Sequence, residues 1–358
     1  MPPETSDMNE SDIKEEYTRF IGRKILFIAI LAALLILIAG IAASLGSANI
    51  ALTDTYSAIL ERFFPDYLSP SNLATNVVWN LRLPRILMGV AAGIGLAVAG
   101  SAMQGILRNP LASPYTLGIA SAAGFGAALA ILLGKGFIGG EYLVIANSFI
   151  FALLASVVII GIARYKGARP ETMILAGIAI MYFFSAMTSL LQYFGDADAV
   201  KEVVFWMLGD LDRSSWDTLG IVGIVLVLCV PLLMLRSWDL NVMAAGDETA
   251  KSLGVQVERV RVLSMVLAAL LTASIVCFTG TIGFIGLVSP HITRMAIGGD
   301  NRFLIPASGL VGAVLLVGAD TIARNIIAPV ILPVGIMTSF IGVPFFFYLI
   351  MRKGREYW

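Results

Sequence analysis

The chain has 358 residues, of which 58% are hydrophobic and only 13% are charged, whereas a soluble domain averages about 45–50% apolar and about 25% charged residues. Its mean hydropathy is +0.88. The 24 basic and 24 acidic residues cancel, which excludes the basic excess of a nucleic-acid-binding protein. Composition therefore predicts an integral membrane protein without a nucleic-acid partner.

The first 24 residues are polar and lack the apolar core of a secretory signal, which predicts a cytosolic segment, disordered in part. Uncharged stretches long enough for a helix to cross a bilayer follow. In chain order these cover residues 25–45, 86–107, 109–134, 142–163, 172–195, 218–235, 262–280, a shorter broken helix up to 299, 303–319, and 325–351 with its helix beginning near Pro333. The sequence predicts an all-α domain of ten transmembrane helices over residues 25–352 and a cytosolic tail at 353–358.

The distribution of Lys and Arg favours ten crossings with both termini in the cytosol. Basic residues concentrate on the cytosolic side, and this arrangement places 17 of the 24 inside. If residues 262–299 formed a single crossing, only 13 would lie inside. We therefore predict a multi-pass protein of the cell membrane, plasma or inner. The loop of residues 196–217, with six acids and two bases, lies outside.

Two predicted spans carry a small residue at every fourth position, a spacing that lets membrane helices approach closely. The second span has Gly89, Gly93, Ala97, Ser101 and Gly105, and the third has Gly118, Ala122, Gly126, Ala130 and Gly134. We expect both spans in the middle of a helix bundle. The pattern is typical of static packing, and a sliding helix is the alternative.

The fifth and tenth predicted spans carry hydroxyl and amide side chains: Ser185, Thr188, Ser189 and Gln192 in the fifth, and Thr338 and Ser339 in the tenth. A polar face in a membrane must meet water, a ligand or another helix, so these residues either line a passage or bond between helices. Neither set contains a carboxylate, although ion-coupled carriers keep ionisable groups at mid-membrane. The sequence also lacks a phosphate-binding loop. Uphill transport would need energy from another chain.

Cysteine and histidine point to structural roles. Cys229 and Cys277 lie inside apolar runs, typical of buried thiols. His291 has no second ligand at metal-binding spacing, which favours a packing or capping role. We predict neither a metal site nor an enzymatic centre on this chain.

Residues 236–261 form the longest predicted cytosolic loop and contain a short helix. Asp247, Glu248 and Thr249 open this helix with acids in its first turn, and Gly254 closes it. From its position alone, the helix either docks a soluble partner or lies against its own bundle.

Five motifs together resemble the permease subunits of type II ATP-binding-cassette (ABC) importers, the vitamin B12 and iron-siderophore permease family. They are LRLPR at residues 81–85, QGILRNPLASPYTLG at 104–118, GDETAKSLGV at 246–255, TGTIGFIGLVSPHITR at 279–294 and LPVGIMTSFIGVP at 332–344. The resemblance extends from about residue 81 to residue 352. One departure is DNR at 300–302, where many relatives have DHR.

The resemblance implies a homodimer with two cytosolic ATPase subunits and an extracytoplasmic substrate-binding protein. ATP and Mg²⁺ would bind to the ATPase, and this chain would bind no cofactor. The implied ATPase-coupling segment is Gly246, Asp247, Glu248, Thr249, Ala250, Lys251, Ser252, Leu253 and Gly254. Spans five and ten would line the translocation path.

The resemblance also implies that Arg82, Arg85 and Arg324, which the charge distribution places outside, receive glutamates of the binding protein. The alternative is a position at the membrane interface or an internal ion pair, with Asp320 as the partner of Arg324. The implied cargo is a bulky metal chelate, with an iron(III)-siderophore first and cobalamin or haem as alternatives. The competing class is an ion-coupled secondary transporter.

Overall fold

The computed structural model describes residues 10–46, 50–167 and 169–351, and the secondary structure within them is helical. The longer helices are α1 (Glu10–Ser44), α4 (Leu83–Leu107), α5 (Ile119–Leu133), α6 (Leu143–Lys166), α7 (Pro170–Phe194), α9 (Trp216–Leu235), α12 (Val257–Thr279), α13 (Ile285–Ile297), α14 (Asn301–Asn325) and α15 (Val334–Met351). The shorter helices are α2 (Leu52–Glu61), α3 (Asn72–Val77), α8 (Ala197–Met207), α10 (Ser237–Ala244) and α11 (Asp247–Ser252). A π-helical turn, Val78–Arg82, joins α3 to α4.

Each of the ten predicted crossings coincides with one of the longer helices. Seven helices in the described part of the chain are long and apolar enough to cross a membrane, judged by length and composition. The other three, α5, α13 and α15, are shorter than those seven. The all-α membrane architecture is confirmed, and the number of ten crossings stays a prediction.

Several helix ends differ from the predicted ones. Helix α5 begins ten residues later than predicted because residues 109–118, which contain two prolines, form turns after α4. Helix α14 continues to Asn325 instead of ending at residue 319, and α1 already begins at Glu10. Residues 10–24 are therefore helical and continuous with the first span. The predicted tail at 353–358 lies outside the described residues.

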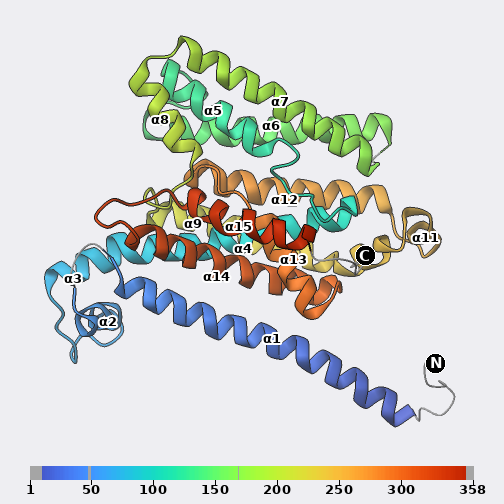
Figure 1. Ribbon diagram of the computed structural model, residues 1–358, viewed down its shortest axis with the longest axis horizontal. Helices are drawn as coiled ribbons and strands as arrows, with labels where there is room; N and C mark the ends of the chain where they lie inside the picture. The colour runs from blue at the N-terminus through green and yellow to red at the C-terminus, as the bar shows by residue number, and fades with distance from the viewer. Residues whose placement is uncertain (1–9, 47–49, 168, 352–358) are drawn as a thin grey trace.

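Helix α4 lies at the centre of the bundle, packed against α14, α12, α13 and α9. Its small-residue stripe faces α14: a Cβ atom on Gly93 would lie 2.6 Å from the Gly312 carbonyl oxygen and from the Ala313 backbone. The stripe on α5 likewise meets α6, where Gly126 touches the Asn147 backbone. The close approach predicted for both stripes is present. Helix α4 lies in the middle of the bundle as predicted, whereas α5 lies in a group of helices on one side (Figure 1).

The helices form three groups (Figure 1). Helices α5 to α8 lie together on one side, the group around α4 occupies the middle, and α1 runs along the opposite side. Helices α2 and α3 lie at one end of the bundle, which we call the α2–α3 end. Helix α11 lies at the other, the α11 end. The two ends carry the two polar sites described below.

The outward faces of the long helices are apolar. Ile36 on α1 is 74% exposed and Val227 on α9 is 73% exposed, as expected for side chains that contact lipid.

Cys229 and Cys277 are buried free thiols, as predicted. The rings of His291 and Phe345 lie 6.4 Å apart in an edge-to-face contact.

Candidate coupling, docking and path sites

Helix α11 forms where the sequence predicts a short helix in the coupling loop. Gly246 precedes it with φ +114° and Gly254 follows with φ +86°, conformations that residues with a side chain rarely adopt. Asp247 and Glu248 lie in the first turn, where the helix dipole favours negative charge. The predicted helix, with its acidic start and its glycine end, is confirmed.

One side of α11 is fixed to the bundle through Asp247. Its carboxylate accepts hydrogen bonds of 2.9 and 3.1 Å from Nη2 of Arg261 on α12, and it lies 3.7 Å from Nη2 of Arg108. Arg261 is 1% exposed, and its Nε donates to the Ile106 carbonyl of α4. Burial raises the pKa of Asp247, but the hydrogen bond and charge of Arg261 and the charge of Arg108 outweigh it and lower the pKa overall. The first residue of α11 is therefore held by a buried cation.

The other side of α11 faces away from the bundle. Ala250 is buried, whereas Leu253 is 68% exposed. The Glu248 and Lys251 side chains are 89% and 52% exposed, and Lys251 Nζ donates to Glu248 at 2.9 Å. That hydrogen bond and the Glu248 charge raise the pKa of Lys251. An exposed leucine beside two charges on an anchored helix has the geometry of a docking surface for a soluble partner.

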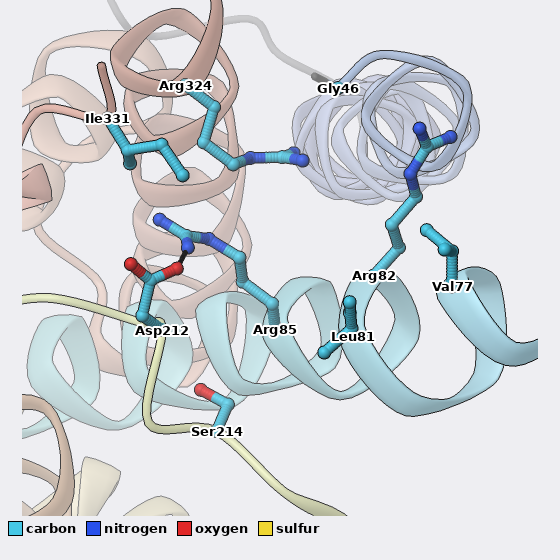
Figure 2. A pocket seen from close by; sticks show the side chains of 9 residues that line it. All are labelled: Gly46, Val77, Leu81, Arg82, Arg85, Asp212, Ser214, Arg324 and Ile331. Carbon is cyan, nitrogen blue, oxygen red and sulfur yellow. Dashed lines mark ion pairs between the residues drawn. The ribbon is translucent and has the colours of Figure 1, made fainter. Parts of the chain in front are cut away.

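Three arginines lie together at the α2–α3 end, two of them pointing into the space between α4 and α14 (Figure 2). Arg85 projects from α4, Arg82 from the π-helical turn before it, and Arg324 from the last turn of α14. All three are only 5 or 6% exposed. The structure therefore brings together the three arginines for which the family resemblance implies binding-protein docking.

Each arginine also has a partner within the chain. Arg85 Nη2 donates to Asp320 at 2.7 Å, and Arg324 Nε donates to the second oxygen of Asp320 at 3.0 Å. Arg82 Nη1 donates to the Ala43 carbonyl at the end of α1 at 2.7 Å. The internal ion pair between Arg324 and Asp320, which the sequence offered as the alternative, is present.

The arginines line a hollow of about 210 Å³ at the protein surface. Its lining comprises Gly46, Val77, Leu81, Arg82, Arg85, Asp212, Ser214, Arg324 and Ile331. Asp212, whose side chain is half exposed, forms an ion pair with Arg85. Asp210 lies 3.3 Å from the same guanidinium, and burial raises the pKa of Asp210 despite the Arg85 charge. A carboxylate from outside would meet guanidinium groups here and would compete with Asp212.

A second, mostly apolar hollow of about 590 Å³ lies along α15. It is lined by Tyr115, Met207, Leu208, Thr281, Gly283, Gly335, Ile336, Ser339, Phe340, Val343 and Pro344. Ser339 donates to the Gly335 carbonyl at 2.8 Å. Thr338 is buried and donates to the same carbonyl at 3.1 Å. Of the two predicted path residues on this helix, Ser339 borders this hollow and Thr338 does not.

The predicted path residues on α7 have different environments. Ser185 and Ser189 are exposed, Gln192 is half-buried, and Thr188 is buried with its hydroxyl bonded to the Phe184 carbonyl of the same helix. Helix α7 packs against α5 and α6, whereas α15 packs against α14 and α13. The two sets of predicted path residues thus lie on separate parts of the subunit.

Comparison of the sequence with protein-family models identifies the family of this chain. The model described as the FecCD transport family matches residues 31–352. The chain belongs to this family. The match covers nearly all of the described helices, including α11 and the three arginines.

Three relatives are similar to this chain over 79% or more of their own length. A protein of Methanocaldococcus jannaschii assigned as an ABC transporter permease is 45% identical over 96% of this chain and 99% of its own length. The hemin transport system permease protein of Yersinia pestis is 38% identical over 87% of this chain and 93% of its own. The cobalamin import system permease protein of Halobacterium salinarum is 38% identical over 85% of this chain and 79% of its own length.

A solved structure has the same fold. It is described as a metal-chelate-type ABC transporter in an inward-facing conformation, and it superposes with a TM-score of 0.79 at 32% identity over 90% of this chain and 98% of its own. This FecCD chain is therefore a permease subunit of an ABC importer in the plasma membrane. It is a transport subunit and not an enzyme, because ATP hydrolysis belongs to a separate subunit.

Sequence reasoning missed the partners that hold both polar sites. In the sequence, Arg108 and Arg261 are only two of the 17 basic residues predicted on the cytosolic side, yet in the structure they anchor α11. Asp210 and Asp212 were visible only as part of an acidic loop, yet they face Arg85. Nothing in local sequence marks these pairs, because they join residues that packing brings together from distant helices.

Proposed function

We propose that this chain, as a homodimer with two ATPase subunits, imports a bulky metal chelate that an extracytoplasmic binding protein delivers. ATP and Mg²⁺ bind to the ATPase, and the permease opens and closes the path. The α11 end faces the cytosol together with both termini. The observation that carries the proposal is α11 itself, which is anchored to a buried arginine on one side and exposed on the other.

The coupling segment, residues 246–254, rests on the ATPase through its exposed side. Glu248, Lys251 and Leu253 supply the contact, and the Asp247–Arg261 pair transmits movement of α11 to α12 and α4. A helix held at its first residue moves with the bundle instead of bending alone. This is the mechanical requirement for ATP hydrolysis on one subunit to reshape another.

The path runs between the two copies, next to α15 and α7. Support comes from the hollow beside Ser339 and from the exposed hydroxyls of Ser185 and Ser189. Thr188, Gln192 and Thr338 belong to the same two helices and complete the proposed path residues. Small hydroxyl groups and apolar walls suit a large chelate that must not bind tightly during passage.

The binding protein docks at the α2–α3 end through carboxylates that enter the arginine hollow. Guanidinium groups bind carboxylates in paired geometry, and Asp212 already occupies one such position beside Arg85. The cargo we favour is an iron(III)-siderophore. Cobalamin and haem are the alternatives, because relatives are named for hemin and cobalamin transport.

Purification of the tagged chain in mild detergent from its own host tests this proposal. Mass spectrometry of the co-purifying chains should recover an ABC ATPase at one copy per permease. The variant Glu248→Lys with Lys251→Glu keeps the pair within α11 but inverts the charges shown to the partner, and we expect it to lose the ATPase. The variant Arg236→Glu with Asp239→Arg, an inversion on the same side of the bundle but outside α11, is the control. A wild-type chain that remains folded and purifies alone would refute the proposal.

A further inference from the structure

Next to α11, hydrogen bonds join α10 to the start of α14. Asn241 of α10 bonds both to Asp300 and to Asn301, the two residues at the start of α14. We call these three residues the clasp; the proposed function does not use them. We propose that Asn241 is a positioning residue that transmits movement of the coupling segment to α14. The inference rests on the proposed function, in which α11 moves with the ATPase.

Both polar atoms of the Asn241 side chain form hydrogen bonds in the clasp. Asn241 Nδ2 donates to Asp300 Oδ1 at 2.8 Å. Asn241 Oδ1 accepts from the backbone N–H of Asn301 at 2.8 Å and from its side-chain amide at 2.9 Å. Asn301 is only 6% exposed. A buried N-terminal amide of α14 is thus satisfied by a side chain of α10, so that the two helices are joined directly.

The α14 side of the clasp is rigid. Asp300 caps α14 by accepting the Arg302 backbone N–H at 3.1 Å, and it accepts the Arg302 guanidinium through Nε and Nη2. Lys24 of α1 lies 3.7 Å from the same carboxylate. The Arg302 guanidinium lies over the ring of Trp238, another α10 residue, at 4.3 Å. The clasp is therefore held by α1, α10 and α14 together.

The α10 side of the clasp moves with the coupling segment. Helix α10 ends at Ala244, and the Gly246 backbone N–H, directly before α11, donates to the Met243 carbonyl of α10 at 3.1 Å. Met243 and Leu240 are fully buried, and Leu240 covers Gly105 of α4. A displacement of α11 is consequently passed to α10 and, through Asn241, to the start of α14.

Helix α14 carries such a displacement to the opposite end of the bundle. Its 25 residues span about 37 Å at 1.5 Å per residue. Its last turns hold Asp320 and Arg324, which bond to each other and, through Asp320, to Arg85 in the arginine hollow. Its backbone at Gly312 and Ala313 packs directly against Gly93 of α4. One continuous helix therefore joins the clasp to the site proposed for the binding protein.

The test uses the complete complex of permease, ATPase and binding protein in proteoliposomes. The substrate is whichever of an iron(III)-siderophore, hemin and cobalamin the unaltered complex imports. We expect Asn241→Ala to assemble and to hydrolyse ATP at the basal rate, yet to consume about fivefold or more ATP per substrate imported, the size of a typical coupling between sites. Asp239→Ala, which removes a surface ion pair from the same helix, should leave this ratio unchanged. An unchanged ratio in Asn241→Ala would overturn the inference.

A partner swap separates positioning from stability. Asn241→Asp places two carboxylates together and should uncouple transport. The double variant Asn241→Asp with Asp300→Asn restores an amide facing a carboxylate, and we expect it to recover at least half of the wild-type ratio of import to hydrolysis. Recovery no better than in the single variant would overturn the inference even if Asn241→Ala fails to fold. Absence of ATP-driven uptake by the unaltered chain would instead refute the proposed function.

Discussion

The guanidinium of Arg85 donates hydrogen bonds of 3.0, 3.1 and 2.7 Å to the carboxylate of Asp320, although the two residues are 235 positions apart. Both side chains are buried, and Asp320 also accepts from Arg324. One carboxylate thus compensates two buried cations and ties α4 to α14. Asp320 is the carboxylate that these two cations share, and Asp210 and Asp212 add further negative charge beside Arg85 alone.

Asp320→Asn should destabilise the protein strongly, because it leaves two buried guanidinium groups without their main counter-charge. Breaking a buried ion pair in this way costs about 3–5 kcal/mol. Thermal unfolding in detergent, followed by intrinsic fluorescence, measures the effect. Asp212→Asn, which removes a half-exposed partner of the same Arg85, is the matched control and should shift the midpoint far less. Equal shifts for the two variants would contradict the role assigned to Asp320.

The contact between α4 and α14 predicts a second stability difference. Gly93→Ala adds a Cβ atom 2.6 Å from backbone atoms of α14, and forcing extra atoms into a closely packed site costs about 1–3 kcal/mol. Gly223→Ala on α9 makes the same chemical change where, in the described part of the chain, no atom beyond its neighbours and its own helix backbone lies within 4 Å of the added Cβ. We expect a lower unfolding midpoint for Gly93→Ala alone. A drop in both variants would attribute the effect to glycine itself and not to the helix contact.

The carboxylate of Asp300 predicts a pH dependence at the clasp. Burial raises its pKa, but hydrogen bonds from Arg302 and Asn241 and the charge of Arg302 outweigh this and lower the pKa from 3.8 to about 2. Because the folded-state pKa is depressed, its stabilising contribution is complete above pH 3.8 and is lost as the pH falls towards 2. Infrared spectra of the wild type minus Asp300→Asn should show this carboxylate still ionised at about pH 3. A difference band that titrates at pH 4 would contradict the clasp geometry.

Most of the helices could be predicted from the sequence, because uncharged runs of crossing length are rare outside membranes. The small-residue stripe on α4 also predicted a close contact correctly. The start of α5 was wrong because Asn109 to Gly118 form turns despite lacking charge. The ion pairs Asp247–Arg261 and Arg85–Asp320 could not be predicted from the sequence, since they depend on which distant helices pack together.

The arginine hollow predicts the charge dependence of binding-protein docking. Arg82→Glu should weaken docking about tenfold at low salt, equivalent to about 1.4 kcal/mol, and should make the remaining affinity less sensitive to salt. Lys135→Glu changes an exposed basic residue on the predicted outer side but away from the hollow, and this variant should bind as the wild type does. Surface plasmon resonance with the immobilised permease complex measures both. Equal weakening of the two variants would mean that overall charge, and not the hollow, governs docking.

The central claim is that ATP hydrolysis on a partner subunit, acting through α11, drives import through this permease. The most direct test is substrate uptake into proteoliposomes that contain the purified permease–ATPase complex and its binding protein, with and without ATP and with and without an ionophore. We predict uptake that requires ATP and is unaffected by the ionophore. Uptake that proceeds without ATP and collapses with the ionophore would contradict the claim and identify an ion-coupled carrier.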